Sequence, residues 1–140
     1  MTEFDFLIRL VLAAVFGGIV GWERQQGKKP AGLRTHMLVA LGSALFTLIS
    51  FLIISDFAEY AIDPSRIAAG IVTGIGFLGA GAIIQSQEKV IGLTTAASVW
   101  TVAAIGMAVA YGFFILAGGT AILTVAVLYI LEKVERKYSD

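Results

Sequence analysis

The chain has 140 residues, of which 58% are hydrophobic and 14% are charged, and its mean hydropathy is +0.88. This balance excludes an ordinary water-soluble domain and indicates an all-α integral membrane protein with a single transmembrane domain over residues 1–140. Ten basic and ten acidic residues leave no net charge, so no nucleic-acid partner is expected, and the absence of cysteine excludes disulfides and thiolate metal sites.

Hydropathy predicts a bundle of five transmembrane helices, because about 20 apolar residues are needed to cross the hydrocarbon of a bilayer. We expect these helices over residues 4–22, 35–55, 66–85, 93–111 and 113–131. The N-terminus lacks the basic region of a signal peptide, so the first span is expected to be retained. The last two spans share one apolar stretch that is too long for one helix, so a turn is expected near Tyr111 and Gly112.

The distribution of basic residues predicts the orientation of the bundle. Eight of the ten Lys and Arg residues follow the first, third or fifth span, and only Arg9 and Arg66 lie near the opposite side. The connection over residues 56–65 carries Asp56, Glu59 and Asp63 and no basic residue. Because basic loops remain in the cytoplasm, we expect the N-terminus outside and the C-terminus inside.

Four charged residues lie in or near the outer ends of the spans. Asp5 and Arg9 are one turn apart and can form a pair whose Arg stem reaches the interface; alternatively, Arg9 faces the bundle interior and belongs to a solute path. Asp63 and Arg66 open the third span, where a carboxylate favours a helix N-terminus. The acidic connection is interpreted as a solvated loop, with a specific cation site as the alternative.

Glycines concentrate in the first and third spans. Gly17 and Gly21 form a small-xxx-small face that predicts tight packing. The third span contains Gly70, Gly74, Gly76, Gly79 and Gly81. Their spacing formally matches a dinucleotide fingerprint, but the flanking segments have no strand signal, so this interpretation is rejected. The glycines instead predict either close helix packing or a broken helix whose backbone lines a polar pore.

An internal repeat relates the first four spans. A shift of 60 residues matches Gly21 with Gly81, and the motif Gly-Leu-x-Thr at residues 32–35 recurs at residues 92–95. The match predicts two helical hairpins of the same orientation, related by a pseudo-twofold axis along the membrane normal. In that arrangement we expect the first and third spans to pack on each other through their glycines.

The two Gly-Leu-x-Thr motifs predict two helix N-termini on the cytoplasmic side, whose free amides favour an anion, with Glu23 as the internal candidate. The second span is expected to be capped by Thr35. A polar cluster that serves as a ligand or proton site is expected from Glu23, Arg24, Arg34, Thr35, His36, Thr94 and Thr95. His36 is interpreted as an interfacial histidine, a proton-sensing or ligand-contacting residue, or a metal ligand, although no second His or Cys identifies a metal.

Four long segments of the chain are GWER at residues 21–24, PAGLRTH at 30–36, GIGFLGAG at 74–81 and GLTTAASVW at 92–100. Together they resemble the membrane domain of the MgtC/SapB family of bacterial inner-membrane proteins. The resemblance implies a multi-span protein associated with adaptation to low magnesium, in a family described both as magnesium transport proteins and as modulators of other membrane machinery. The chain ends at Asp140, so we expect it to lack the soluble cytoplasmic domain of longer members.

Two functions remain open. The first is a transport-related protein for Mg²⁺ or another small ion, expected to form a homo-oligomer because five short helices enclose little polar volume. No Asp or Glu lies deep in a span, so backbone carbonyls or the hydroxyls of Thr73, Thr94 and Thr95 would have to bind the ion. The second is a non-transporting module that binds other membrane proteins within the lipid bilayer. An enzyme is not expected, nor is any cofactor beyond Mg²⁺ as a ligand.

Overall fold

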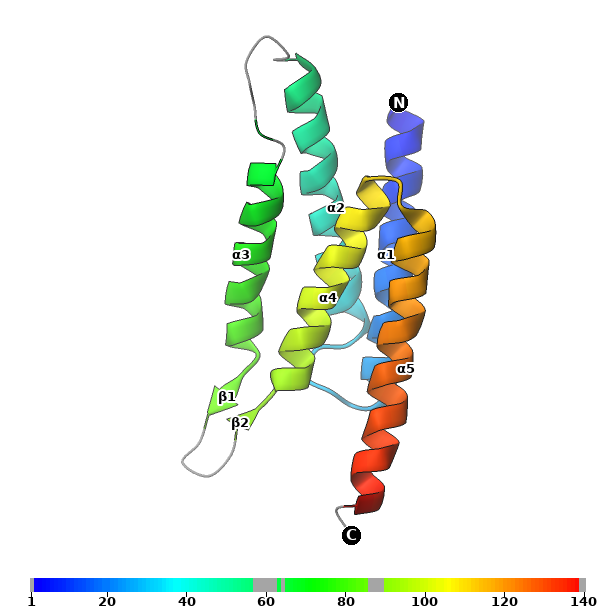
Figure 1. The fold of residues 1–140 in the computed structure, drawn as a ribbon, viewed down its shortest axis with the longest axis vertical. Coiled ribbons are helices and arrows are strands. Elements are labelled where there is room, and N and C mark those ends of the chain that lie inside the picture. The colour runs from blue at the N-terminus through cyan, green and yellow to red at the C-terminus, as the bar shows by residue number, and fades with distance from the viewer. Residues whose placement is uncertain (1, 57–62, 64, 86–89, 139–140) are drawn as a thin grey trace.

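The computed structural model describes residues 2–56, 63, 65–85 and 90–138. Within these residues the chain forms an elongated bundle of five helices, α1 Glu3–Gln26, α2 Leu33–Asp56, α3 Ser65–Gly81, α4 Leu93–Ala110 and α5 Phe114–Tyr138 (Figure 1). Two short strands, β1 Ile84–Gln85 and β2 Val90–Ile91, pair antiparallel between α3 and α4. The predicted all-α membrane fold is confirmed, with four helices long and apolar enough to cross a membrane and α3 as a shorter apolar helix.

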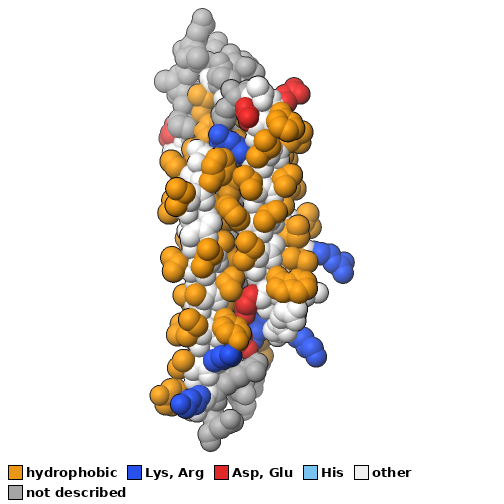
Figure 2. Space-filling view, turned by 90° about the vertical axis from the view of Figure 1, so that its right-hand side faces the viewer, with side chains coloured by type: hydrophobic (Ala, Val, Ile, Leu, Met, Phe, Trp, Pro, Cys, Tyr) orange, Lys and Arg blue, Asp and Glu red, His pale blue; other side chains and the backbone are white. Residues whose placement is uncertain are grey.

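The surface agrees with this assignment. Hydrophobic side chains cover most of the length of the face in Figure 2, and several of its Lys and Arg side chains lie toward the lower end. Large apolar residues are exposed along the helices, including Phe77 at 81% and Ile115 at 93% of their accessible area. Since such a surface is unfavourable in water, it fits a multi-pass protein whose helices face lipid.

Several predicted boundaries differ from the structure. α1 ends at Gln26 and α5 at Tyr138, beyond the predicted ends at residues 22 and 131. Two further differences have a visible cause. The third span was expected over residues 66–85, but α3 ends at Gly81, because Ile84 and Gln85 pair with Ile91 and Val90 as strands. Thr35 is not the cap of the second span, because α2 begins at Leu33. The first amide of α2 is satisfied from another helix, since Leu33 N donates to the side-chain oxygen of Gln25 at 3.2 Å.

Close backbone contacts hold α1, α2 and α4 together. A Cβ on Gly17 would lie 2.7 Å from the carbonyl oxygen of His36, and one on Gly21 would lie 2.8 Å from the Cα of Leu33. On α4, a Cβ on Gly106 would overlap the carbonyl oxygen of Ala40. The predicted tight packing of the Gly17 and Gly21 face is therefore confirmed, and its partner is α2.

The expected packing of the first and third spans through their glycines is wrong. The glycines of α1 face α2, while α3 lies mainly along α4 and contacts α2 only slightly. Of the α3 glycines, a Cβ on Gly79 would approach Ala96 at 3.5 Å, whereas Gly70, Gly74, Gly76 and Gly81 face open space. The helix runs unbroken from Ser65 to Gly81, so the expected alternative of a discontinuous helix does not occur.

The two halves of the predicted repeat share their outline. Both are antiparallel hairpins, and α2 and α4 begin at the Leu of their Gly-Leu-x-Thr motifs (Figure 1). The glycines of the two motifs differ, because only Gly92 has a positive φ, 98°. The halves also pack differently, since α1 lies closely along α4 but α3 stands away from α2. The pseudo-twofold relation remains a prediction.

The α4–α5 turn falls at Tyr111 and Gly112 as predicted, with Gly112 at a φ of 85°. Arg9 lies against this turn: its Nη1 donates to the carbonyl oxygen of Ala110, and its guanidinium carbon is 5.7 Å from the ring centroid of Phe114. Arg9 therefore connects α1 to the turn between α4 and α5.

Asp5 does not form the predicted pair with Arg9. Its Oδ2 accepts hydrogen bonds from the backbone N of Thr2 at 2.8 Å and from the Thr2 hydroxyl at 2.9 Å. The contact with Thr2 N and the reciprocal hydrogen bond from Asp5 N to Thr2 Oγ1 at 3.2 Å form a capping box at the start of α1. The Asp5 carboxylate is therefore satisfied within its own helix terminus, because the donors of Thr2 lie next to it and Arg9 is one turn away.

Candidate functional site

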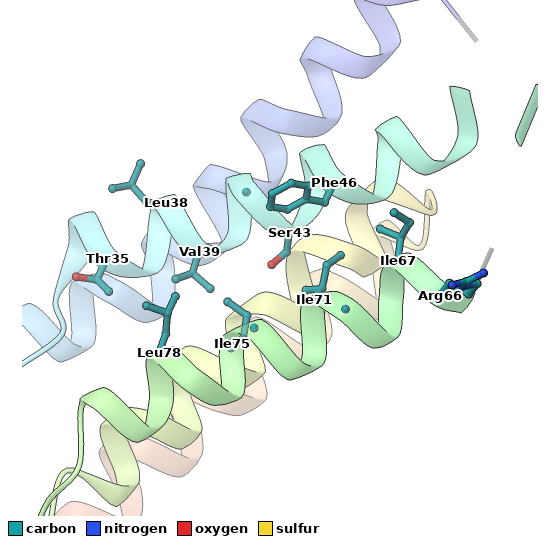
Figure 3. Close-up of a pocket in the computed structure, with 13 residues that line it drawn as sticks. Thr35, Leu38, Val39, Ser43, Phe46, Arg66, Ile67, Ile71, Ile75 and Leu78 are labelled. Atoms are coloured by element: carbon teal, nitrogen blue, oxygen red, sulfur yellow. The ribbon is translucent and has the colours of Figure 1, made fainter. Parts of the chain in front are cut away.

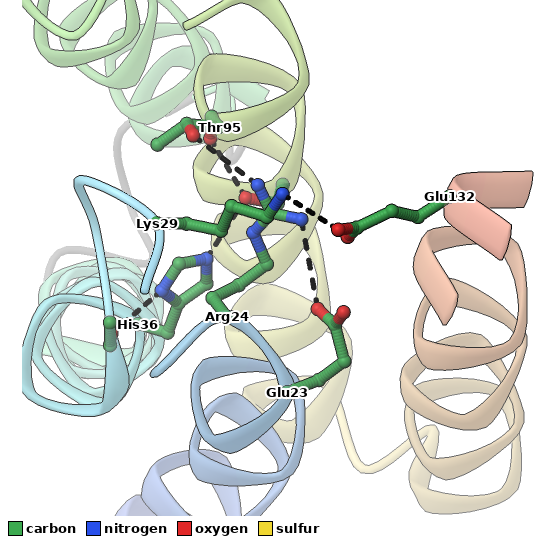
Figure 4. A network of polar contacts seen from close by, with 8 residues as sticks. Glu23, Arg24, Lys29, His36, Thr95 and Glu132 are labelled. Carbon is green, nitrogen blue, oxygen red and sulfur yellow. Dashed lines mark hydrogen bonds and ion pairs between the residues drawn. The ribbon is translucent and has the colours of Figure 1, made fainter. Parts of the chain in front are cut away.

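A polar cluster is buried where α1 ends and α2 and α4 begin, at the end of the bundle that the charge distribution predicts to be cytoplasmic (Figure 4). Arg24 exposes 3% of its surface and His36 none. Arg24 extends the buried stripe of α1 formed by Ala13, Gly17 and Val20, which explains why a charged residue is carried into the interior.

His36 is fixed at both ring nitrogens. Its Nδ1 lies 2.8 Å from the carbonyl oxygen of Gly32, which can only accept, so Nδ1 carries a proton and donates. Its Nε2 lies 3.0 Å from Ser98 Oγ, which is also 2.8 Å from the carbonyl oxygen of Thr95. The single hydroxyl hydrogen of Ser98 goes to Nε2 when the ring is neutral and to Thr95 when the ring is charged. Both nitrogens therefore keep a partner in either state.

Arg24 and Glu23 are less completely satisfied. Arg24 Nη1 lies 3.7 Å from Glu23 Oε2, and its Nη2 donates to Thr95 Oγ1 over a long 3.4 Å. Among the residues that the structure describes, Arg24 Nε and Glu23 Oε2 are buried without a hydrogen-bond partner. A buried polar atom without a hydrogen-bond partner costs about 1–3 kcal/mol, so the pair of Glu23 and Arg24 does not gain the full stability of a satisfied ion pair.

A second ion pair closes the cluster toward α5. Lys29, in the loop between α1 and α2, lies 3.0 Å from Glu132 Oε1, with the two side chains 28% and 24% exposed. Beside it is a cavity of about 430 Å³, and it is lined by Trp22, Glu23, Gln26, Gly27, Tyr129, Glu132 and Lys133. The cavity gives the carboxyl region of Glu23 a route to the surface.

The structure brings together four of the seven predicted cluster residues, Glu23, Arg24, His36 and Thr95. The other three, Arg34, Thr35 and Thr94, are exposed and lie outside the network. The predicted cluster did not include Ser98, Lys29 or Glu132, although Ser98 is one of the fourth-span hydroxyls that can bond to a neighbouring helix. Ser98 could have been found, because it follows Thr95 by one helical turn on the buried stripe of α4. Lys29 and Glu132 carried no signal, since their contact joins segments 103 residues apart.

At the opposite end, the predicted charges Asp63 and Arg66 lie at the start of α3. Asp63 Oδ1 accepts a hydrogen bond from Ser65 N at 2.9 Å. Hydrogen bonds from the side chain and backbone of Ser65 hold the pKa of Asp63 below its usual value, and Arg66 adds a smaller attraction. Asp56 and Glu59, the other members of the predicted acidic connection, cannot be compared: Glu59 lies outside the described residues, as does the Asp56 side chain.

Apolar packing separates the two polar ends. The buried core between them consists mainly of Ala and Val, and includes Ala13, Ala40, Ala44, Val102 and Val109. Two buried hydroxyls of α2, on Thr47 and Ser50, donate to carbonyl oxygens of their own helix at 2.8 and 2.6 Å. Within the described residues, no three His, Cys, Asp or Glu side chains lie close enough to hold a metal ion.

Comparison with known proteins gives consistent matches. The family model described as "MgtC family" matches residues 10–137. "Putative magnesium transporter YhiD" of Escherichia coli (strain K12) is 46% identical over 92% of this chain and 61% of its own length. "Protein MgtC" of Salmonella typhimurium (strain LT2) is 42% identical over 97% of this chain and 57% of its own length. "Protein SapB" of Bacillus subtilis (strain 168) is 39% identical over 79% of this chain and 49% of its own length.

The chain spans about three fifths of the first of these relatives and about half of the last. No solved structure matches it significantly. None of the three printed names describes an enzyme.

Proposed function

Because the chain belongs to the MgtC family, we propose that it is a multi-pass protein of the bacterial inner membrane that acts in adaptation to low magnesium. We propose further that it works as a module that binds and modulates other membrane proteins and does not itself conduct ions. The magnesium link is supported by the printed name of the Escherichia coli relative.

The observation that carries the modulating role is the apolar core. An ion leaving the Glu23 and His36 region toward the opposite end would have to pass the close contact of Gly17 with α2 and the packed layer around Val102 and Val109. Residues of this layer offer no carboxylate or free carbonyl to replace the hydration of Mg²⁺, which dehydrates reluctantly. A single copy therefore supplies a binding scaffold and no ion path.

One face of α3 is suited to a partner helix. Ala69, Thr73, Gly76 and Ala80 are exposed and recur at the three- and four-residue spacing of one helix face. Small residues at this spacing let the backbones of two membrane helices approach closely. We assign this small-residue face of α3 to the partner protein.

Small-ion transport is the second candidate. It is favoured by Glu23 Oε2, which has an ion-pair contact with Arg24 but no hydrogen bond among the described residues, and by the adjacent cavity of about 430 Å³, which together could receive a cation at the cytoplasmic end. In this alternative the remainder of the path would form between copies in a homo-oligomer, since the core of one copy is apolar.

Two measurements on the same variants test the proposal. Purified chain in liposomes that contain a Mg²⁺-sensitive dye should give no flux above protein-free liposomes. In a strain that lacks the chain, wild type should restore growth in low magnesium, and Gly76→Leu should not, because the leucine blocks the partner face. Gly119→Leu is the matched control, because Gly119 also faces open space but lies on α5.

A flux of Mg²⁺ into liposomes that contain the wild-type chain, and its loss with Glu23→Gln, would establish transport and reject the modulating role. Full growth with Gly76→Leu would remove the small-residue face of α3 from the mechanism. Gel filtration of the Gly76→Leu protein, extracted from the membrane in detergent, must show a folded species, so that misfolding is not counted as loss of binding.

A further inference from the structure

A groove of about 730 Å³ separates α2 from α3 and extends from Thr35 at one end to Arg66 at the other (Figure 3). Its walls are mainly apolar and include Leu38, Val39 and Phe46 of α2 and Ile71 and Leu78 of α3. Val39 points toward α3 in Figure 3. Three glycines also line it, Gly42, Gly70 and Gly74, and a Cβ on any of them would meet nothing within 4 Å. The groove is thus an unfilled apolar space between two helices.

The equivalent contact on the other side of the two hairpins indicates that this space is not required by the topology. In the predicted repeat, the contact between α1 and α4 corresponds to that between α3 and α2. The first pair packs closely and the second touches only slightly. A gap in an apolar interior loses dispersion contacts on both walls, so some molecule must occupy this one in a bilayer.

The dimensions of the groove favour a hydrocarbon chain as its occupant. Arg66 and Leu78 are 12 positions apart, about 18 Å along a helix that rises 1.5 Å per residue. One leaflet contributes about 15 Å of the hydrocarbon core, so an acyl chain of that leaflet matches the length. A spanning helix about 10 Å wide and 30 Å long has a volume of about 2,400 Å³, so it could rest over the groove but not fill it.

The charge at one end matches a phospholipid headgroup. Arg66 lies at the end of the groove and in the first turn of α3, where the helix dipole also favours an anion (Figure 3). Among the described residues, its guanidinium makes no hydrogen bond or ion pair. The neighbouring carboxylate of Asp63 is engaged by Ser65. The guanidinium can therefore bind a phosphate through two parallel hydrogen bonds.

We propose that the α2–α3 groove is a specific site for an anionic phospholipid from the leaflet on the Arg66 side. The phosphate binds Arg66, and one acyl chain lies between the helices over Gly70 and Gly74. The lipid then supplies the packing that α1 gives to α4 at the equivalent contact between the two hairpins. This inference does not depend on the proposed modulating role.

The test separates the groove from the rest of α3. Gly74→Leu places a side chain in the groove without a backbone clash, so the variant should fold but lose the acyl-chain site. Gly76→Leu is the matched control, because Gly76 lies two residues further on, also faces open space and does not line the groove. Arg66→Gln removes the headgroup contact, and Arg34→Gln removes an exposed arginine outside the groove.

The chain is purified in mild detergent with added phosphatidylglycerol or phosphatidylethanolamine, and native mass spectrometry counts the lipids that each variant retains. Wild type, Gly76→Leu and Arg34→Gln should retain one phosphatidylglycerol per chain. Gly74→Leu should retain roughly tenfold less of either lipid, and Arg66→Gln should lose a roughly tenfold preference for phosphatidylglycerol, as expected for one charged hydrogen-bonded contact.

Wild-type retention of phosphatidylglycerol by both Gly74→Leu and Arg66→Gln would overturn the proposal. A change in the mass of the assembly in Gly74→Leu, with lipid retention unchanged, would instead assign the groove to a second copy of the chain. Equal loss of lipid in Gly74→Leu and Gly76→Leu would likewise reject a site confined to the groove. Thermal unfolding of each variant identifies any loss that comes from misfolding.

Discussion

Replacing Gly106 by alanine tests whether the contact between α2 and α4 is the central packing interface of the bundle. The added Cβ would overlap the carbonyl oxygen of Ala40 and lie 2.9 Å from its carbonyl carbon. Carbon atoms in favourable contact are about 3.5–4.0 Å apart, so the helices must separate by about 0.5–1 Å. The obstructing atoms belong to the backbone, so no side-chain rotation can relieve the overlap.

The net change in the free energy of unfolding is the difference between the cost of overpacking and the gain in helix propensity. Overpacking in a close-packed interior costs about 1–3 kcal/mol, and separation of the helices also weakens the neighbouring contacts of Val102 and Val109. Alanine is a better helix former than glycine by about 1 kcal/mol, which partly offsets this cost. We therefore expect Gly106→Ala to lower the free energy of unfolding by about 1–2 kcal/mol.

The assay is unfolding of the purified chain in mixed micelles by titration with a denaturing detergent, followed by circular dichroism. Gly119→Ala is the control, because a Cβ there meets nothing within 4 Å and only the gain in helix propensity applies. The two variants should differ by about 2–3 kcal/mol, with the control at or above wild type. If Gly106→Ala is as stable as Gly119→Ala, the close approach of α2 and α4 does not exist.

Two further predictions use the same titration. Gly17→Ala should be destabilised by about 1–3 kcal/mol, because its Cβ would lie 2.7 Å from the carbonyl oxygen of His36, whereas Gly18→Ala, with 3.4 Å to the nearest side-chain atom, should remain near wild type. Ser98→Ala should cost about 1–3 kcal/mol by leaving His36 Nε2 unpaired, while the exposed Thr94→Ala changes stability by less than about 0.5 kcal/mol. Equal stability within either pair would contradict the corresponding contact.

Periodicity and composition predict much of this fold. The five helices, the turn at Gly112 and the close approach at Gly17 and Gly21 all follow from local patterns, because apolar length and small-residue spacing act within one helix. The end of α3 could not be predicted in the same way. The residues after Gly81 remain apolar, and the pairing of Ile84 and Gln85 as a strand depends on Val90 and Ile91 further along the chain.

The candidate site was only partly predictable for a similar reason. His36 and Arg24 stand out as polar residues in apolar surroundings, but their partners depend on how α1, α2 and α4 cross. The ion pair of Lys29 with Glu132 and the open side of α3 depend on contacts between distant segments. A hydrophobic pattern shows that a helix is buried or faces lipid, and it does not specify which neighbour lies against each face.

The contact of Arg9 with the carbonyl of Ala110 has a consequence for synthesis and membrane insertion. The two residues are 101 positions apart, so the guanidinium in α1 has no permanent acceptor until the end of α4 has left the ribosome and reached the membrane. Until α4 and α5 are inserted, the guanidinium of Arg9 must therefore be solvated elsewhere, for example by the lipid headgroups. The final environment of Arg9 in the N-terminal helix is thus completed by the C-terminal half of the chain, and we expect truncation before Ala110 to leave the guanidinium without this acceptor.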